Sequence, residues 1–228
     1  MLEKTGNLAS RGHRPSASSL ASILTLVLFL ATLLAVPFAY YRDRYTTTKR
    51  FRVVAEGVLY RSGQMTAEGL AEVIDRYGIR TVINLQDETP DPLLENGQTE
   101  SEFCRDRGIR YVYMPPDLIP RQFVPEQRPA AIDRFLDIMN DPQNHPVLLH
   151  CRAGLHRTGV LAAVYRMEYD GWTTRQALEE LKANGFGDSK AIASNDYIMQ
   201  YILTYTPSSD RNRPLSLTPS FCPEKRVE

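Results

Sequence analysis

The positions of hydrophobic and polar residues divide this chain into regions of different character. Residues 20–41 are apolar on all sides, without the stripe that marks an amphipathic helix, and contain no charged residue. Residues 51–205 alternate short apolar runs with segments in which apolar residues recur every three or four positions. Residues 1–19 are rich in Ser, Gly and Ala, and residues 206–228 are rich in Ser, Pro and charge. We therefore expect a flexible N-terminal tail, an apolar helix, one folded domain and a disordered C-terminal tail.

The pattern within residues 51–205 predicts strands that alternate with helices. Thr66 is a suitable N-cap, and Gly78 a suitable stop, for one of these helices. A sheet whose strands are joined by helices is mostly parallel and is covered on both faces. The sequence therefore predicts an α/β fold with a central, mostly parallel sheet flanked by helices. The expected strands are 51–54, 58–61, 80–85, 109–114 and 146–149, and the expected helices are 66–77, 126–139, 158–169, 174–184, 194–205 and one through Phe103 that ends near Gly108.

One motif in this domain carries phosphate chemistry. Residues 150–159 read His-Cys-Arg-Ala-Gly-Leu-His-Arg-Thr-Gly and join an expected strand to an expected helix. The backbone N–H groups of such a turn can point at one anion, and the helix adds the positive end of its dipole. Arg157 supplies a planar fork for two phosphate oxygens. The same positive surroundings favour the thiolate of Cys151, which is the nucleophilic form, and Thr158 can offer its hydroxyl to that sulfur.

The spacing of Cys151 and Arg157 resembles the C-x5-R-[ST] signature of the cysteine-dependent protein tyrosine phosphatase superfamily, in its dual-specificity form. Residues 58–64 and 78–85 resemble the opening of atypical dual-specificity phosphatases, namely the plant and fungal type and its bacterial relatives. The resemblance covers residues 51–205 and implies the phosphatase type of α/β fold. It implies catalytic roles for Cys151, Arg157 and Thr158, and phosphate binding by Arg152, Ala153, Gly154, Leu155, His156 and Arg157.

Three alternative interpretations of Cys151 agree less well with this motif. A lone cysteine after a core strand is often buried and inert. Sulfurtransferases of the rhodanese type carry shorter loops, which would not put an arginine at position 157. Low-molecular-weight phosphatases and arsenate reductases carry the loop near the start of the domain, whereas here about a hundred residues of the domain precede it. We therefore adopt the phosphatase interpretation.

A cysteine phosphatase needs a general acid that protonates the leaving oxygen. Asp117 lies 34 positions before Cys151, on a proline-rich loop that follows an expected strand, and the family places its acid similarly. The alternative is that Asp117 caps a turn between prolines. Asp133 and Asp137 lie on an amphipathic helix and are expected to be solvated. The reserve candidates lie on an earlier acidic loop and are Asp87, Glu88 and Asp91.

Residues 20–41 are long enough to cross a bilayer as one helix. A cleaved signal peptide is the main alternative, but its apolar region is usually shorter, and Pro37 disturbs the expected cleavage site. A buried core helix would show an apolar stripe. Residues 42–50 form a basic juxtamembrane linker, and more Lys and Arg follow the span than precede it. The positive-inside rule therefore predicts a single-pass anchor with the catalytic domain in the cytoplasm.

The amino-acid composition limits the kinds of partner and cofactor that we expect this protein to bind. The first fifty residues hold 7 of the 27 Lys and Arg but only 2 of the 27 Asp and Glu, so the remainder is mildly acidic, which argues against nucleic-acid binding. Three scattered cysteines are too few for a disulfide framework or a zinc site. The predicted mechanism needs neither metal nor cofactor, and we expect a monomeric catalytic domain.

Two substrate classes fit this chemistry. The first is phosphotyrosine in proteins, together with phosphoserine or phosphothreonine; the second is an inositol phosphate or phosphoinositide. Relatives that act on inositol compounds often carry more lysines in the loop, and Leu155 occupies one of those positions, whereas Arg152 keeps this class open. Arg61 and Arg121 are candidates for further charge at the rim, or are ordinary surface residues. A catalytically dead phosphate-binding module is the third hypothesis, disfavoured because the nucleophile, arginine and hydroxyl are all present.

Overall fold

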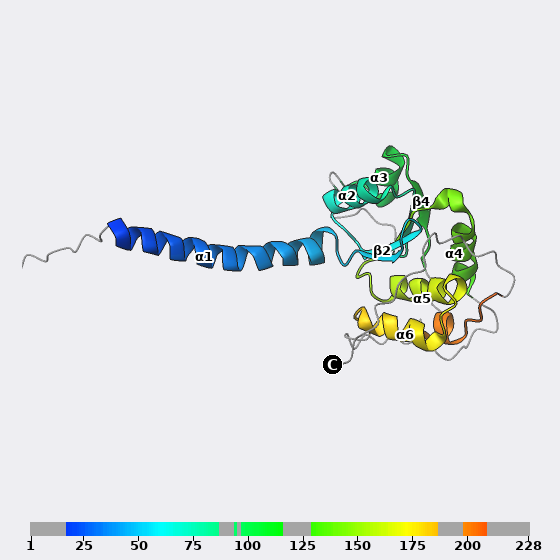
Figure 1. The fold of residues 1–228 in the computed structure, drawn as a ribbon. Helices are drawn as coiled ribbons and strands as arrows, with labels where there is room; N and C mark the ends of the chain where they lie inside the picture. Colours follow the sequence, from blue (N-terminus) through cyan, green and yellow to red (C-terminus); the bar gives the residue numbers. More distant parts are fainter. Residues whose placement is uncertain (1–16, 87–93, 95–96, 116–128, 187–197, 209–228) are drawn as a thin grey trace, which may run out of the picture. The chain divides into compact units, whose positions relative to one another are not determined.

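A five-stranded sheet lies at the centre of residues 43–228, one of two units into which the chain divides (Figure 1). The computed structural model describes residues 17–86, 94, 97–115, 129–186 and 198–208. The strand order is β1-β2-β5-β3-β4; β1 pairs antiparallel with β2, and the remaining pairs are parallel. The strands are β1 (Arg52–Ala55), β2 (Leu59–Gly63), β3 (Thr81–Asn84), β4 (Arg110–Tyr113) and β5 (Val147–Cys151).

Helices cover both faces of the sheet, as the sequence predicts (Figure 1). One face packs on α2 and α3, the other packs on α4 and α5, and α6 packs against α5. The α-helices of this unit are α2 (Ala67–Tyr77), α3 (Glu100–Asp106), α4 (Ala130–Asn140), α5 (Arg157–Tyr169) and α6 (Thr174–Ala183). Shorter helical segments are η1 (Asp43–Thr47), η3 (Pro142–Asn144) and η4 (Ile198–Leu203). The fold is therefore an α/β fold with a mixed sheet flanked by helices.

Successive side chains of β5 point to opposite faces of the sheet, up to Cys151 at its end. Leu149 and Cys151 belong to the core cluster that contains α5, whereas Leu148 belongs to the cluster that contains α2 and α3. Successive strand residues point to opposite faces, so His150 points toward α3. Because β5 lies between β2 and β3, its carboxyl end is surrounded by two neighbouring strand ends.

Most element boundaries agree with the sequence prediction. The Thr66 side chain accepts a hydrogen bond from the N–H of Gly69, and Gly78 ends α2 in the left-handed conformation, with φ of 62°. The helix expected at 126–139 begins at Ala130; residues 126–128 lie outside the described residues. These capping signals are local, which explains why the sequence alone identifies them.

The helix expected over residues 194–205 is present in its described part, where Ile198–Leu203 forms a π-helix and not an α-helix; residues 194–197 lie outside the described residues. Tyr201 and Ile202 are adjacent and both buried, and this segment packs against α5. A widened turn presents adjacent side chains to the same helix, so tertiary packing overrides the regular period here.

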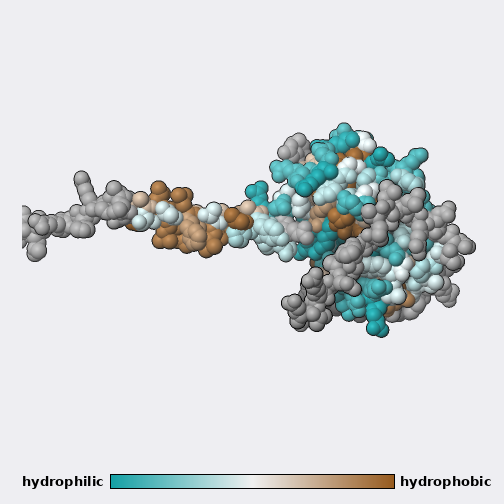
Figure 2. Space-filling model, in the orientation of Figure 1, coloured by the Kyte–Doolittle hydropathy of each residue, from teal (hydrophilic) through white to brown (hydrophobic). Residues whose placement is uncertain are grey.

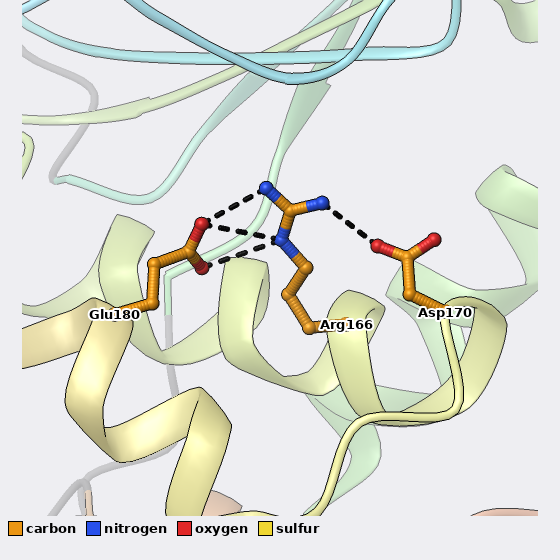
Figure 3. A network of polar contacts seen from close by, with 3 residues as sticks. All are labelled: Arg166, Asp170 and Glu180. Carbon is orange, nitrogen blue, oxygen red and sulfur yellow. Dashed lines mark hydrogen bonds and ion pairs between the residues drawn. The ribbon is translucent and has the colours of Figure 1, made fainter. Parts of the chain in front are cut away.

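A buried arginine ties α5 to α6 (Figure 3). Arg166 donates hydrogen bonds to both carboxylate oxygens of Glu180 on α6, including one of 2.9 Å from Nη2. Its Nη1 donates to the Asp170 carboxylate at 2.8 Å. Burial lowers the pKa of Arg166, but these bonds outweigh burial and raise it overall. This network ties the carboxyl-terminal end of α5 to α6.

The N-terminal unit contains α1 (Ala17–Arg42), whose apolar side chains are exposed along the helix (Figure 2). Within the described part of the chain, one segment, Ala21–Thr47, is long and apolar enough to cross a membrane, with a mean hydropathy of 2.4. A signal sequence and a buried core helix can pass the same test, so length and composition give weak evidence for a span.

Candidate active site

Cys151 is the last residue of β5, the middle strand of the sheet, and its side chain is only 4% exposed. Residues 152–156 form the loop that follows, and α5 begins at Arg157. The expected strand, turn and helix therefore surround the motif in the predicted order. This arrangement brings the amino end of α5 next to the nucleophile candidate, where the helix dipole favours an anion.

Three consecutive carbonyl groups of this loop accept hydrogen bonds from residues 50–64. The Arg152 carbonyl accepts from the Gln64 N–H at 3.3 Å. The Ala153 carbonyl accepts from Arg50 Nη1 at 3.2 Å, and the Gly154 carbonyl accepts from Arg61 Nη2 at 2.8 Å. The loop is thus held by the segment that follows α1 and by the end of β2.

The structure contradicts both positions that the sequence suggests for Arg61, the rim of the site and the ordinary surface. Arg61 is 2% exposed and lies beneath the loop. Burial, with a contribution from nearby Arg52, lowers the pKa of Arg61 to about 10, while the charges of Glu180 and Cys151 oppose that shift. Arg61 therefore remains a cation at neutral pH. Arg121, the other rim candidate, lies outside the described residues.

Gly154 lets the loop approach β2 closely. Its φ is 71°, in the left-handed region, and a Cβ at this position would lie 2.4 Å from the Gly63 nitrogen. The same Cβ would lie 2.5 Å from the carbonyl carbon of Ser62. Both neighbours are backbone atoms, so a side chain at position 154 would push the loop away from the strand.

His150 is paired with a carboxylate that no motif in the sequence indicates. Its Nε2 lies 2.5 Å from Glu100 Oε1, and the two side chains are 3% and 6% exposed. Glu100 is the first residue of α3, whose capping box places Thr99 as N-cap and Glu102 at the third position. The capping box predicts the start of a helix there, but no sequence signal links that helix to residue 150.

Arg157 and Thr158 occupy the first turn of α5. Arg157 Nη1 donates a hydrogen bond of 2.8 Å to the carbonyl of Leu85, just beyond β3. The N–H of Leu85 in turn donates to the His150 carbonyl at 2.9 Å. Thr158 is fully buried, and its Oγ1 has no hydrogen-bond partner among the described residues. Its hydroxyl is therefore available to a group that is brought to the loop.

The remaining loop side chains differ in exposure. Arg152 is exposed, whereas Leu155 and His156 are half-buried. The His156 ring meets the Phe186 ring edge-on, with 5.3 Å between centroids. Burial lowers the pKa of His156, so its imidazole is neutral at pH 7 and adds no permanent positive charge.

The general-acid candidates fall on parts of the chain that the structure does not describe. Asp117 lies outside the described residues, as do the reserve candidates Asp87, Glu88 and Asp91. Of the two helix carboxylates that the sequence expects to be solvated, Asp137 is exposed on α4, as expected, whereas Asp133 is only partly exposed. Among the described residues, the structure thus brings together Cys151, the loop and the first turn of α5.

Comparisons with known proteins find chains that are similar over this domain. A family model described as a DSP-PTPase phosphatase fused to NAD+ kinase matches residues 36–199. The inositol diphosphatase DSP1 of Oryza sativa subsp. japonica is 32% identical over 170 residues, which cover 74% of this chain and 69% of that protein. The dual specificity protein phosphatase TpbA of Pseudomonas aeruginosa (strain UCBPP-PA14) is 54% identical over 43 residues, 19% of this chain and 20% of that protein. The match to TpbA thus spans a fifth of its length.

A solved structure supports the fold. The core catalytic domain of the PP-IP phosphatase SIW14 from S. cerevisiae, in complex with citrate, has a TM-score of 0.53 to this chain. The similarity covers 70% of this chain and 87% of that one, at 24% sequence identity. The sheet and its flanking helices are therefore shared with a known phosphatase core.

Proposed function

This chain belongs to the DSP-PTPase phosphatases, cysteine-based phosphoric monoester hydrolases, and on that premise we propose that Cys151 forms a phosphocysteine intermediate during turnover. The observation that carries the proposal is the position of Cys151 at the end of a central strand, directly before a loop that enters a helix. Such a position combines inward-facing amides with the helix dipole around a dianionic phosphate. The other two catalytic roles of the motif fall to Arg157 and Thr158.

The proposed reaction has two displacements. The Cys151 thiolate attacks phosphorus, so an S–P bond forms while the P–O bond to the leaving group breaks, and Asp117 gives its proton to the leaving oxygen. Water then attacks phosphorus with Asp117 as base, the S–P bond breaks, and inorganic phosphate leaves. Loop amides and Arg157 stabilise the charge on the transferred group, and Thr158 donates its hydroxyl hydrogen bond to the departing sulfur.

Two substrate classes fit this reaction, phosphotyrosine in proteins and inositol phosphates, and one observation favours inositol phosphates. Phosphotyrosine in proteins is the class that the dual-specificity motif predicts, and the short match to TpbA supports it. Inositol phosphates are supported by a match of 170 residues to an inositol diphosphatase, which covers far more of this chain. We therefore propose inositol phosphates, including those that carry a diphosphate group, as the first class to test.

We also propose that α1 anchors the enzyme in a membrane, with the catalytic domain in the cytoplasm. The length and hydropathy of the segment support a span, and the basic residues after it support this orientation. Tethering would hold the enzyme beside membrane phosphoinositides or membrane-associated phosphoproteins. The proposed domain boundaries are a tail at 1–19, the span at 20–41, a linker at 42–50, the catalytic domain at 51–205 and a tail at 206–228.

A substrate panel on washed membranes tests these proposals together. Full-length protein is expressed, membranes are washed with carbonate at high pH, and the pellet is assayed in EDTA with an aryl phosphate, phosphopeptides, inositol phosphates and an inositol diphosphate. We expect activity in the pellet, with kcat/KM at least about ten-fold higher for one natural class than for the others. Activity only in the wash would contradict anchoring. A preference for phosphotyrosine peptides would contradict the inositol proposal, and no turnover of any substrate would support the dead module.

Replacement of Asp117 by Asn tests the proton donor. A general acid contributes about 10²- to 10⁴-fold, so we expect kcat to fall within that range for alkyl phosphates, whose leaving groups are poor. An aryl phosphate with a good leaving group should be affected much less. The pH–rate profile should also lose its basic limb, because that limb reports deprotonation of the acid. Asp137→Asn, an exposed change on α4, is the matched control and should leave the profile unchanged. A normal profile in Asp117→Asn would give the role to Asp87, Glu88 or Asp91.

A further inference from the structure

The carbonyl groups of Arg152, Ala153 and Gly154 all bond to donors from one short segment, residues 50–64. These donors are of three kinds: a backbone N–H, a half-buried guanidinium and a buried guanidinium. The peptide bonds of the loop are trans, since the described residues contain a cis bond only at His145–Pro146. In a planar trans peptide, the C=O of one residue and the N–H of the next point in opposite directions. A carbonyl held on one side therefore directs the next N–H to the other side.

We propose that Arg50 and Arg61 are positioning residues that turn the loop amides toward the phosphate site. Arg50 holds the Ala153 carbonyl and so orients the N–H of Gly154, whereas Arg61 holds the Gly154 carbonyl and so orients the N–H of Leu155. Gln64 does the same for the N–H of Ala153 through its backbone bond. Within the described part of the chain, no backbone carbonyl accepts from the N–H groups of residues 152–156. These N–H groups can therefore donate hydrogen bonds to a bound oxyanion.

The juxtamembrane segment is built to hold Arg50 in place. Lys49 and Arg50 both have positive φ, 36° and 60°, which is uncommon for residues other than glycine. The Lys49 carbonyl accepts a 2.7 Å bond from the Gly63 N–H, and the Thr47 carbonyl accepts a 3.3 Å bond from the Thr66 N–H. Strained backbone persists where surrounding contacts over-determine it, and here those contacts end at the catalytic loop. The segment that follows α1 is thus part of the active-site wall.

The inference rests on the proposed role of the loop in binding the transferred phosphoryl group. Under this proposal, Arg50 and Arg61, which are far from the motif in sequence, set the affinity of the loop for an oxyanion. Arg50 carries this role with a half-buried side chain, so its loss should leave the fold intact. Removing the half-buried guanidinium of Arg50 should weaken oxyanion binding about five-fold, and removing the buried guanidinium of Arg61 should weaken it about ten-fold or more.

The test uses full-length protein in detergent and inorganic tungstate, a tetrahedral oxyanion, as competitive inhibitor of aryl phosphate hydrolysis. Arg50→Ala, Arg50→Lys and Arg61→Met are compared with wild type for tungstate Ki, kcat/KM, alkylation rate of Cys151 and melting temperature. Arg76→Ala, an exposed change on α2, controls for loss of surface charge. Arg166→Met removes a buried arginine that bonds to Glu180 and Asp170, so it controls for loss of stability.

We expect tungstate Ki to rise about five-fold in Arg50→Ala and to recover in Arg50→Lys, which can still donate to the Ala153 carbonyl. Arg166→Met should lower the melting temperature and leave Ki unchanged. Because Arg61→Met removes a buried charge and can unfold the chain, the decision rests on Arg50. An unchanged Ki and kcat/KM in Arg50→Ala would overturn the inference. By contrast, a wild-type protein that tungstate does not inhibit would count against the proposed function itself.

Discussion

Replacing Cys151 by Ser should lower kcat by at least about 10⁴-fold for every substrate, because the hydroxyl is a far weaker nucleophile than a thiolate. The substitution changes one atom at a site that is 4% exposed, so the loop and its hydrogen bonds should persist. Oxyanion binding should therefore remain within about three-fold of wild type while turnover is lost. Hydrolysis of an aryl phosphate in EDTA gives kcat, and calorimetry with inorganic phosphate gives the affinity.

Cys104 is the matched control for this substitution. It is a second buried cysteine, and burial raises the pKa of its thiol to about 12, so it stays protonated and inert at neutral pH. Cys104→Ala should cost stability and leave specific activity close to wild type. Iodoacetamide should label Cys151 before Cys104, and phosphate should protect Cys151. Turnover that persists in Cys151→Ser would refute the nucleophile assignment and, with it, the phosphocysteine intermediate.

The sequence was sufficient for features that are encoded locally. The helix from Ala67 to Tyr77 has an N-cap, an apolar face and a terminal glycine within one stretch of chain, and the structure confirms all three. The strand before Cys151 and the helix after it are likewise set by adjacent residues. Their order along the chain then implies a sheet covered on both faces, because helical crossovers must pack on parallel strands.

The long-range contacts that complete the site could not be predicted from local sequence patterns. Glu100 meets His150 across fifty positions of sequence, and Arg61 meets Gly154 across 93. A charged residue is most often on the surface, so the sequence predicts Arg61 either at the rim of the site or elsewhere on the surface. Only the pairing of β2 with β5, which places Gly63 opposite Cys151, reveals that Arg61 lies under the loop. The same physics explains η4, where packing against α5 decides the helix type.

Gly154→Ala should have the second largest effect, on both activity and stability. The new Cβ would lie 2.4 Å from the Gly63 nitrogen and 2.7 Å from the Ser62 carbonyl oxygen, so the loop must move away from β2. That movement would break the 2.8 Å bond from Arg61 and turn the amides out of position. We expect kcat/KM to fall about 10²- to 10³-fold, the range seen when a preorganised oxyanion donor is lost. Steady-state kinetics and thermal unfolding measure the two effects.

Gly108→Ala separates this clash from backbone strain. Gly108 has nearly the same φ, 69° against 71°, but a Cβ there would meet nothing within 4 Å. Gly108→Ala should therefore lose about 1–2 kcal/mol of stability, from the strain of an alanine in the left-handed conformation, and keep its activity. If both variants kept full activity and lost similar stability, close approach of the loop to β2 would not matter for catalysis. If only Gly154→Ala lost activity, the loop must be held against β2 in order to bind phosphate, because both variants carry the same strain.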